Sequence, residues 1–170
     1  TTYEYSPAGR LVATVNALGH RTSYTYDANG NQNSVTDAAG YTASSTFTGQ
    51  NQVASVTDGL GNKTTFAYNQ MEQLLEEVDA LGGKTSYAYD ALGHPIALVD
   101  ANGHTTKMSY TPTAQLKEVV LPDGSSVTQE YDALDRLVKQ THSSGLITEY
   151  TYDAADRLLT KKDNQDLNEV

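Results

Sequence analysis

The chain contains no cysteine, few basic residues and no long apolar run. Without cysteine it can form neither a disulfide framework nor a thiolate metal site. No stretch approaches the ~18 consecutive apolar residues that a membrane-spanning helix needs, and we find no signal peptide in the sequence. Lys and Arg number 11 against 21 Asp and Glu, a net charge of −10. Because nucleic acid requires a basic surface, we expect no nucleic-acid partner.

Large aliphatic side chains and Phe are also scarce, since Leu, Ile, Val and Phe together make up 32 of 170 residues. With this net charge, such a composition is typical of disordered chains. Against this, the chain carries 22 Thr and 12 Tyr, both of which favour strands. Eleven of the tyrosines fall in the two slots of a repeated Tyr-x-Tyr pattern. Residues placed so regularly predict folded β-structure.

The second slot of this pattern, which we name the anchor, recurs every 21 residues without insertion. The anchors are Tyr5, Tyr26, Phe47, Tyr68, Tyr89, Tyr110, Tyr131 and Tyr152. The first aromatic slot, two residues earlier, holds Tyr3, Tyr24, Phe66, Tyr87 and Tyr150, with Ser45, Met108 and Gln129 as exceptions. A glycine series follows fourteen residues after the anchors, at Gly19, Gly40, Gly61, Gly82, Gly103, Gly124 and Gly145. A fixed period of this length indicates stacked supersecondary units rather than one globular core.

Each unit reads as a β-hairpin. Turn residues lie four and fourteen positions after the anchors, and Asn29-Gly30, Asn102-Gly103 and Asp123-Gly124 favour tight turns with positive φ. A helix is disfavoured because each internal glycine would cost about 1 kcal/mol. We therefore predict two strands of about seven residues per unit, and roughly sixteen strands in all. Pro95 and Pro112 should lie at strand starts or turns.

Alternation along the strand before each anchor predicts one aromatic face. It places Thr22, Tyr24 and Tyr26 on that face and smaller or polar residues on the other. The next strand begins with an apolar residue such as Leu11 and carries another, such as Val15, four places later. This spacing predicts that Leu11 and Val15 both lie on the aromatic face, so that rings and aliphatic groups are buried together at roughly 25 cal/mol per Å².

A single hairpin of this kind is marginal in water, so neighbouring units have to pair. A strip of roughly sixteen strands is too wide to remain flat and open. We therefore predict an all-β fold in which tandem 21-residue β-hairpin repeats form a twisted, spiral strip or a section of a hollow shell wall.

The motif resembles a known repeat. Residues 24–30 read Tyr-Thr-Tyr-Asp-x-x-Gly and residues 87–93 read Tyr-Ala-Tyr-Asp-x-x-Gly, and both are similar to the tyrosine–aspartate (YD) repeat of the Rhs family. That pattern is close to Gly-x-x-x-Tyr-x-Tyr-Asp-x-x-Gly-Arg-Leu, and the resemblance covers the whole chain. The family includes bacterial polymorphic toxins, the B and C components of insecticidal toxin complexes, and animal teneurins. The resemblance implies a spiral of hairpins around a hollow shell, which in bacterial members holds a C-terminal toxin.

This chain departs from the family pattern at two positions. Asp follows the anchor only at Asp27, Asp90, Asp132 and Asp153. Arg fills the Gly-Arg-Leu slot only at Arg10, Arg136 and Arg157.

Several polar residues have two interpretations. Recurrent aspartates at Asp37, Asp58, Asp79 and Asp100 could cap turns or bind calcium, and their spacing of one full repeat matches no calcium loop, which favours capping. The four histidines are widely spaced, which favours surface turn residues over metal ligands. The Asp-Arg dipeptides at 135–136 and 156–157 could form ion pairs between units, each contributing about 0–1 kcal/mol if exposed. The tyrosines could stack on sugars, but their placement on one face favours packing.

We interpret residues 1–170 as a single YD-repeat array of about eight repeats, a fragment of a longer chain. Its expected function is that of a non-catalytic β-shell segment of an exported Rhs-type protein, secreted or at the cell surface, which encloses or presents a C-terminal toxin or effector. Its partners would be the rest of the shell and the enclosed domain. The alternative is a carbohydrate- or protein-binding adhesion module of a cell-surface YD-repeat protein. We expect no catalytic residue, no cofactor and no metal site; the anchors, the first aromatic slots and the glycine series are predicted to be structural.

Overall fold

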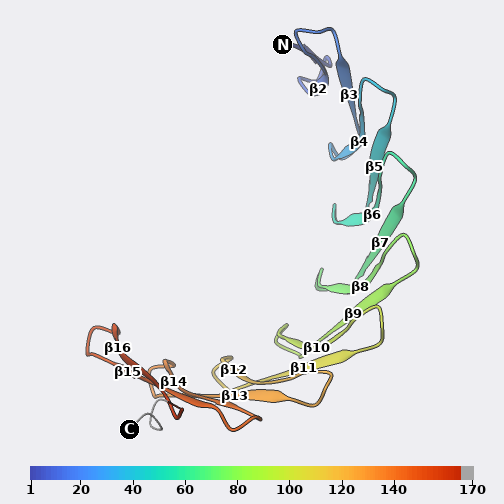
Figure 1. Ribbon diagram of the computed structural model, residues 1–170. Coiled ribbons are helices and arrows are strands. Elements are labelled where there is room, and N and C mark those ends of the chain that lie inside the picture. The colour runs from blue at the N-terminus through green and yellow to red at the C-terminus, as the bar shows by residue number, and fades with distance from the viewer. Residues whose placement is uncertain (166–170) are drawn as a thin grey trace. The chain divides into compact units, whose positions relative to one another are not determined.

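The computed structural model describes residues 1–165, and every regular element in that range is a β-strand (Figure 1). The strands are β1 (Thr2–Tyr5), β2 (Leu11–Val15), β3 (Arg21–Tyr26), β4 (Gln32–Thr36), β5 (Thr42–Phe47), β6 (Val53–Thr57), β7 (Lys63–Tyr68), β8 (Leu74–Val78), β9 (Lys84–Tyr89), β10 (Pro95–Val99), β11 (Thr105–Tyr110), β12 (Leu116–Val120), β13 (Ser126–Tyr131), β14 (Leu137–His142), β15 (Ile147–Tyr152) and β16 (Leu158–Asp163). Strand order in the sheet is the order in the sequence. The predicted all-β hairpin array is confirmed, although the strands have four to six residues rather than seven.

The chain divides into two compact units, Thr1–Thr85 and a second unit that begins at Ser86 within β9. Each unit repeats the same antiparallel geometry. Within a hairpin, the strand that ends on the anchor pairs with the strand after it. In the pair of β3 and β4, for example, Tyr24 lies opposite Val35. Between hairpins only three residue pairs form, as at Ala13↔Ser23, Thr14↔Thr22 and Val15↔Arg21. Pro95 opens β10, as expected of a residue that cannot donate to the ladder.

Every hairpin contains a β-bulge next to its anchor. In the first hairpin Tyr5 pairs with Leu11, whereas the preceding Glu4 pairs with Ala13, so Val12 is an extra residue. The same register shift recurs beside the anchor in all eight hairpins. A bulge bends its strand and increases the local twist.

The bulge overturns one prediction about the faces. Because the extra residue shifts the register by one, Tyr24 pairs with Val35, while Ser23, on the opposite face, pairs with Thr36. The prediction that Val15 and its equivalents share the aromatic face is therefore wrong. Those equivalents are Thr36, Thr57, Val78, Val99, Val120 and Thr141. The first aromatic slot instead lies opposite the residue just before each of them, such as Thr14 or Val35.

The hairpins form one layer without a covering layer among the described residues. Ala13 is the only apolar side chain there that is buried, and no large side chain is fully buried. The exposed surface is 11248 Å², against about 8,100 Å² for a compact monomer of this mass. Most strand residues are half-buried. The array is therefore held together by contacts between successive strands rather than by a central core.

Candidate functional site: the joints between hairpins

Two five-residue turns alternate along each unit. We name the five residues after an anchor the anchor turn (27–31, for example) and the five residues that lead to the next hairpin the return turn (37–41, for example). Both use the same two backbone hydrogen bonds. The Asp27 N–H donates to the Asn31 carbonyl at 2.9 Å and the Gly30 N–H to the Asp27 carbonyl at 3.1 Å, and the return turns repeat this pairing. The fourth residue of both turns has a positive φ.

In most turns the first residue caps the turn with its side chain. Asp58 Oδ1 accepts the backbone N–H of Leu60 at 2.8 Å and that of Asn62 at 2.9 Å. Asp37, Asp79 and Asp100 accept the equivalent pair of N–H groups. The interpretation of these aspartates as turn caps is confirmed. No group of three or more His, Asp or Glu residues in the described part of the chain could hold a metal ion.

Hydrogen bonds lower the pKa of the carboxyl group in several of the turns. The Asn62 side chain and backbone N–H lower the pKa of the Asp58 carboxyl below its ordinary value. In the anchor turns, the Asn31 side chain lowers the pKa of Asp27 and the Arg136 side chain lowers that of Asp132. In these three turns the hydrogen bonds therefore favour the ionised carboxylate over the protonated one.

The glycine series holds left-handed positions in the return turns, and Gly82 has φ 85°. The fourth position of the anchor turns is also left-handed, although glycine occupies it only at Gly9, Gly30 and Gly93. The other five anchor turns place non-glycine residues there, at Asn51, Glu72, Ala114, Asp135 and Asp156, with φ between 59° and 66°. An L-residue with a Cβ pays roughly 1–2 kcal/mol in this conformation. These turns are therefore strained by the residues that they carry.

The hydroxyl of five anchors joins a hairpin to the one before it. The hydroxyl of Tyr26 donates to the Leu11 carbonyl at 2.8 Å, and that of Tyr68 donates to the Val53 carbonyl at 2.9 Å. Tyr110, Tyr131 and Tyr152 make the same bond to the residue fifteen positions earlier, at 2.8–2.9 Å. Sequence reasoning treated the tyrosines as packing residues and missed this bond.

The acceptor of this bond lies beyond the paired part of the ladder. Pairing between β2 and β3 ends at Ala13↔Ser23, two residues after Leu11. No opposing residue therefore pairs with Leu11 on the β3 side, and the Tyr26 hydroxyl satisfies its carbonyl instead. Burial raises the pKa of Tyr110 and of Tyr131 above the ordinary tyrosine value, so these two hydroxyls remain able to donate into more alkaline solution than a free tyrosine.

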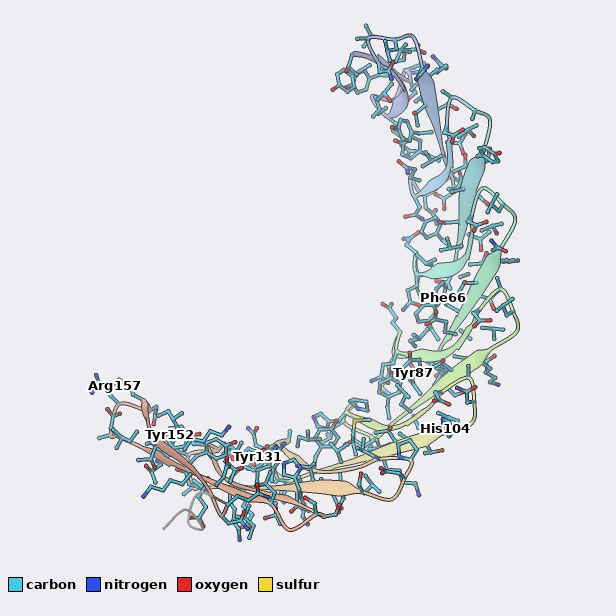
Figure 2. The ribbon with its side chains drawn as sticks, in the orientation of Figure 1. Phe66, Tyr87, His104, Tyr131, Tyr152 and Arg157 are labelled. Carbon is cyan, nitrogen blue, oxygen red and sulfur yellow. The ribbon has the colours of Figure 1, made fainter. Side chains whose placement is uncertain are left out.

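We name the residue just after the left-handed position of an anchor turn the clamp residue, and in several turns it contacts the next hairpin. The Arg136 guanidinium lies over the Tyr152 ring, 5.1 Å from its centroid, and Nη1 donates to the Asp153 carbonyl at 3.2 Å. It also forms ion pairs of 2.7 Å with Asp132 in its own turn and with Asp156 in the next. The prediction of ion pairs between neighbouring 21-residue repeats is confirmed at Arg136–Asp156. Figure 2 shows Tyr131 and Tyr152 on their strands and Arg157 at the turn before β16.

Other clamp residues bind the next hairpin through different chemistry. Arg10 lies 5.6 Å above the Tyr26 ring, and its Nη1 donates to the Asp27 carbonyl at 3.3 Å. Gln52 Nε2 donates to the Glu72 carbonyl at 2.7 Å. His94 stacks on Tyr110 with ring centroids 4.8 Å apart, while its Nδ1 lies 2.9 Å from Asp90 Oδ2. The joint thus accepts Arg, Gln or His, which explains why the Arg of the repeat pattern is so often replaced here.

The RHS repeat family matches residues 5–42, 47–84, 72–106, 115–147 and 131–165, which together span most of the chain. No curated protein matches it significantly. No helix in residues 1–165 is long and apolar enough to cross a membrane.

Similar folds occur in solved toxin structures. A Photorhabdus luminescens Tc holotoxin pore carrying a TccC3 mutation aligns with a TM-score of 0.71 and 17% identity, over 92% of this chain and 10% of that one. The TcdB2-TccC3-Cdc42 complex aligns with a TM-score of 0.61 and 18% identity, over 91% of this chain and 12% of the other. This chain therefore spans about a tenth of the length of the structures that it matches. From the five family matches, the chain belongs to the RHS repeat family.

Proposed function

We propose that this chain is a non-catalytic segment of the β-sheet wall of an exported Rhs-type protein, which encloses or presents a C-terminal toxin or effector. The chain would be a single array of hairpins within a longer wall, acting outside the cell or at its surface. The anchors, first aromatic slots and glycine series would serve as structural positions of this wall. The partners of this chain would be the remaining repeats of the wall and the enclosed domain.

The observation that carries the proposal is the single-layer sheet with repeated joints. A catalytic or binding domain of this size normally buries a core, and this array buries almost none. Its hydrogen bonds and ion pairs instead link each hairpin to the next, which is what a continuous wall requires. The fold is shared with Tc toxin structures, one of which is described as lacking a hypervariable C-terminal region. For the alternative, an adhesion module that binds carbohydrate or protein, no observation in residues 1–165 offers specific support.

Exchange of the array into a related protein tests the proposal. These repeats would replace the structurally equivalent stretch of TccC3 or TcdB2, and protease resistance of the TccC3 C-terminal region would be measured in the assembled complex. We expect the exchanged complex to protect that region as the parent does. A matched exchange with Tyr26, Tyr68 and Tyr131 changed to Phe, which lack the joining hydroxyl, should protect it less well. Assembly with full loss of protection in the unmodified exchange would contradict the wall function.

A second measurement addresses the alternative. Soluble oligosaccharides would be titrated into the chain while tyrosine fluorescence is followed, since rings that bind sugar by stacking change their emission. We expect no saturable change. A saturable change that disappears on substitution of the first aromatic slots would favour the adhesion module.

A further inference from the structure

Two identical tetrapeptides, Asp-Ala-Asn-Gly, occur at 27–30 in an anchor turn and at 100–103 in a return turn. Their backbones match closely. The Gly30 N–H donates to the Asp27 carbonyl at 3.1 Å and the Gly103 N–H to the Asp100 carbonyl at 2.9 Å, and both glycines have positive φ. Asn29 and Asn102 are both exposed. The two sites therefore differ mainly in what surrounds the asparagine side chain.

An Asn-Gly pair can lose ammonia without any enzyme. The glycine backbone nitrogen attacks Cγ of the asparagine side chain and forms a new C–N bond. The bond from Cγ to the amide nitrogen breaks, and the glycine proton leaves with that nitrogen as ammonia. Water then adds to either carbonyl of the resulting succinimide ring and yields aspartate or isoaspartate. Glycine favours ring closure because it carries no Cβ beside the attacking nitrogen.

The side chain of Asn29 is held by the next hairpin. Its Nδ2 donates to Asn51 Oδ1 at 3.0 Å, and the same oxygen accepts Asn31 Nδ2 at 2.8 Å. Gly30 is half-buried beneath Arg10, whose Nη2 would lie 2.9 Å from a Cβ at that position. Ring closure at Asn29 thus requires the amide to leave Asn51 and the chain to move under Arg10.

The side chain of Asn102 has no such restraint. Its backbone N–H donates to Asp100 Oδ1 at 2.9 Å, while its side-chain amide has no hydrogen-bond partner in the part of the chain that the structure describes. Gly103 is exposed, and no atom lies within 4 Å of the position that a Cβ would take. At this site ring closure is opposed only by the turn hydrogen bond from the Gly103 N–H to the Asp100 carbonyl. Gly30 makes the equivalent bond to Asp27, so this bond does not distinguish the two sites.

We propose that Asn102 is a site of spontaneous deamidation in the folded chain, and that Asn51 protects Asn29 from the same reaction. The aspartate product fits the array, because the equivalent residue of the next return turn is already Asp123. There the carboxylate accepts the Ser125 N–H at 2.8 Å and its hydroxyl at 2.6 Å. At 100–104 the equivalent N–H, that of His104, already donates to Asp100, but the backbone hydrogen bonds of the two turns are the same. Deamidation therefore adds a negative charge beside Asp100 without requiring a different backbone turn.

The test is peptide mapping by mass spectrometry after incubation of the 170-residue chain in mildly alkaline buffer. Conversion at Asn102 should be about two- to tenfold faster than at Asn29, the factor expected from one hydrogen bond. In urea the two rates should converge, because the tetrapeptides are identical. The variant Asn51→Gly keeps a residue suited to the φ of 66° at that position and should speed conversion at Asn29 by a similar factor, with no change at Asn102.

Four results would overturn the proposal. The first is conversion of Asn29 as fast as that of Asn102 in the folded chain, and the second is no conversion of Asn102 there. The third is a rate difference that persists in urea, because it would then come from the following residues Asn31 and His104 rather than from the fold. The fourth is an unchanged rate of conversion at Asn29 in Asn51→Gly.

Discussion

Removing the hydroxyl of one anchor tests whether the joints hold the array together. In Tyr68→Phe the ring remains, but the Val53 carbonyl loses the donor that lies 2.9 Å away. A hydrogen bond between neutral groups contributes a net ~0.5–1.5 kcal/mol, so the free energy of unfolding should fall by about 1 kcal/mol. With urea m-values of roughly 1–3 kcal/mol/M, the midpoint should fall by about 0.3–1 M.

The chain supplies the reverse experiment. Phe47 is the one anchor without a hydroxyl, and the position fifteen residues earlier is Gln32, the first residue of β4. Phe47→Tyr should therefore raise the urea midpoint by an amount similar to the loss in Tyr68→Phe. Unfolding would be followed by circular dichroism. Hydrogen exchange of the strands around each joint would report local opening, which repeat arrays permit.

Tyr41→Phe provides the control. Tyr41 lies in a return turn outside both aromatic slots, with 56% of its surface exposed. Its hydroxyl makes no hydrogen bond in residues 1–165, so its removal should leave the midpoint unchanged. Equal losses in Tyr41→Phe and Tyr68→Phe, or a Phe47→Tyr variant no more stable than the parent, would refute the joint hypothesis.

Three further predictions concern the turns and the clamp. Ala114→Gly removes a Cβ at φ 65° and should raise the free energy of unfolding by about 1 kcal/mol, whereas Gly93→Ala at φ 92° should lower it by at least as much, both measured in urea. Arg136→Gln should lower the urea midpoint by removing the contact with Tyr152 and the ion pairs, and high salt should reduce the difference because salt screens those pairs. The lowered pKa of Asp58 contributes stability that is present above the ordinary Asp value of about 3.9 and is lost as the pH falls below it. Asn caps equivalent turns at Asn16 and Asn69 and carries no carboxyl to protonate. Asp58→Asn should therefore lose less stability in acid than the parent chain, as measured by thermal unfolding at different pH values.

The repeat, the hairpins and the turn caps could be read from the sequence because each has a local signal. The 21-residue period of the anchors marks the hairpins. Asp58 could be recognised as a turn residue because it directly precedes a strand with alternating residues. The left-handed position of the anchor turns was only partly visible, because Ala114 and Glu72 occupy it without the glycine that usually marks such a φ. There the neighbouring strands impose the turn on residues that do not favour it.

No single residue type marks the β-bulge. The extra residue is apolar in most hairpins, such as Val12 in the first, but it is Asn33 in the second and Lys117 in the sixth. Strict alternation therefore predicted the wrong face for Val15. The Tyr26–Leu11 hydrogen bond follows from the same bulge, since it depends on where the ladder ends, and a pattern of residue types does not show that.

Joints rather than faces decide which positions of the repeat can vary. The anchor contributes a ring and a hydroxyl to a contact between hairpins, and among eight anchors only Phe47 lacks the hydroxyl. The first aromatic slot lies on an uncovered face, and it holds Ser45 and Gln129 as well as tyrosine. Polar side chains are tolerated there because neither residue is fully buried and Gln129 Oε1 accepts the Tyr131 hydroxyl at 2.5 Å, so no buried polar group is left unpaired. Because each joint is local, the stability of the array is the sum of its joints, and a single weak anchor such as Phe47 weakens one joint without opening the rest.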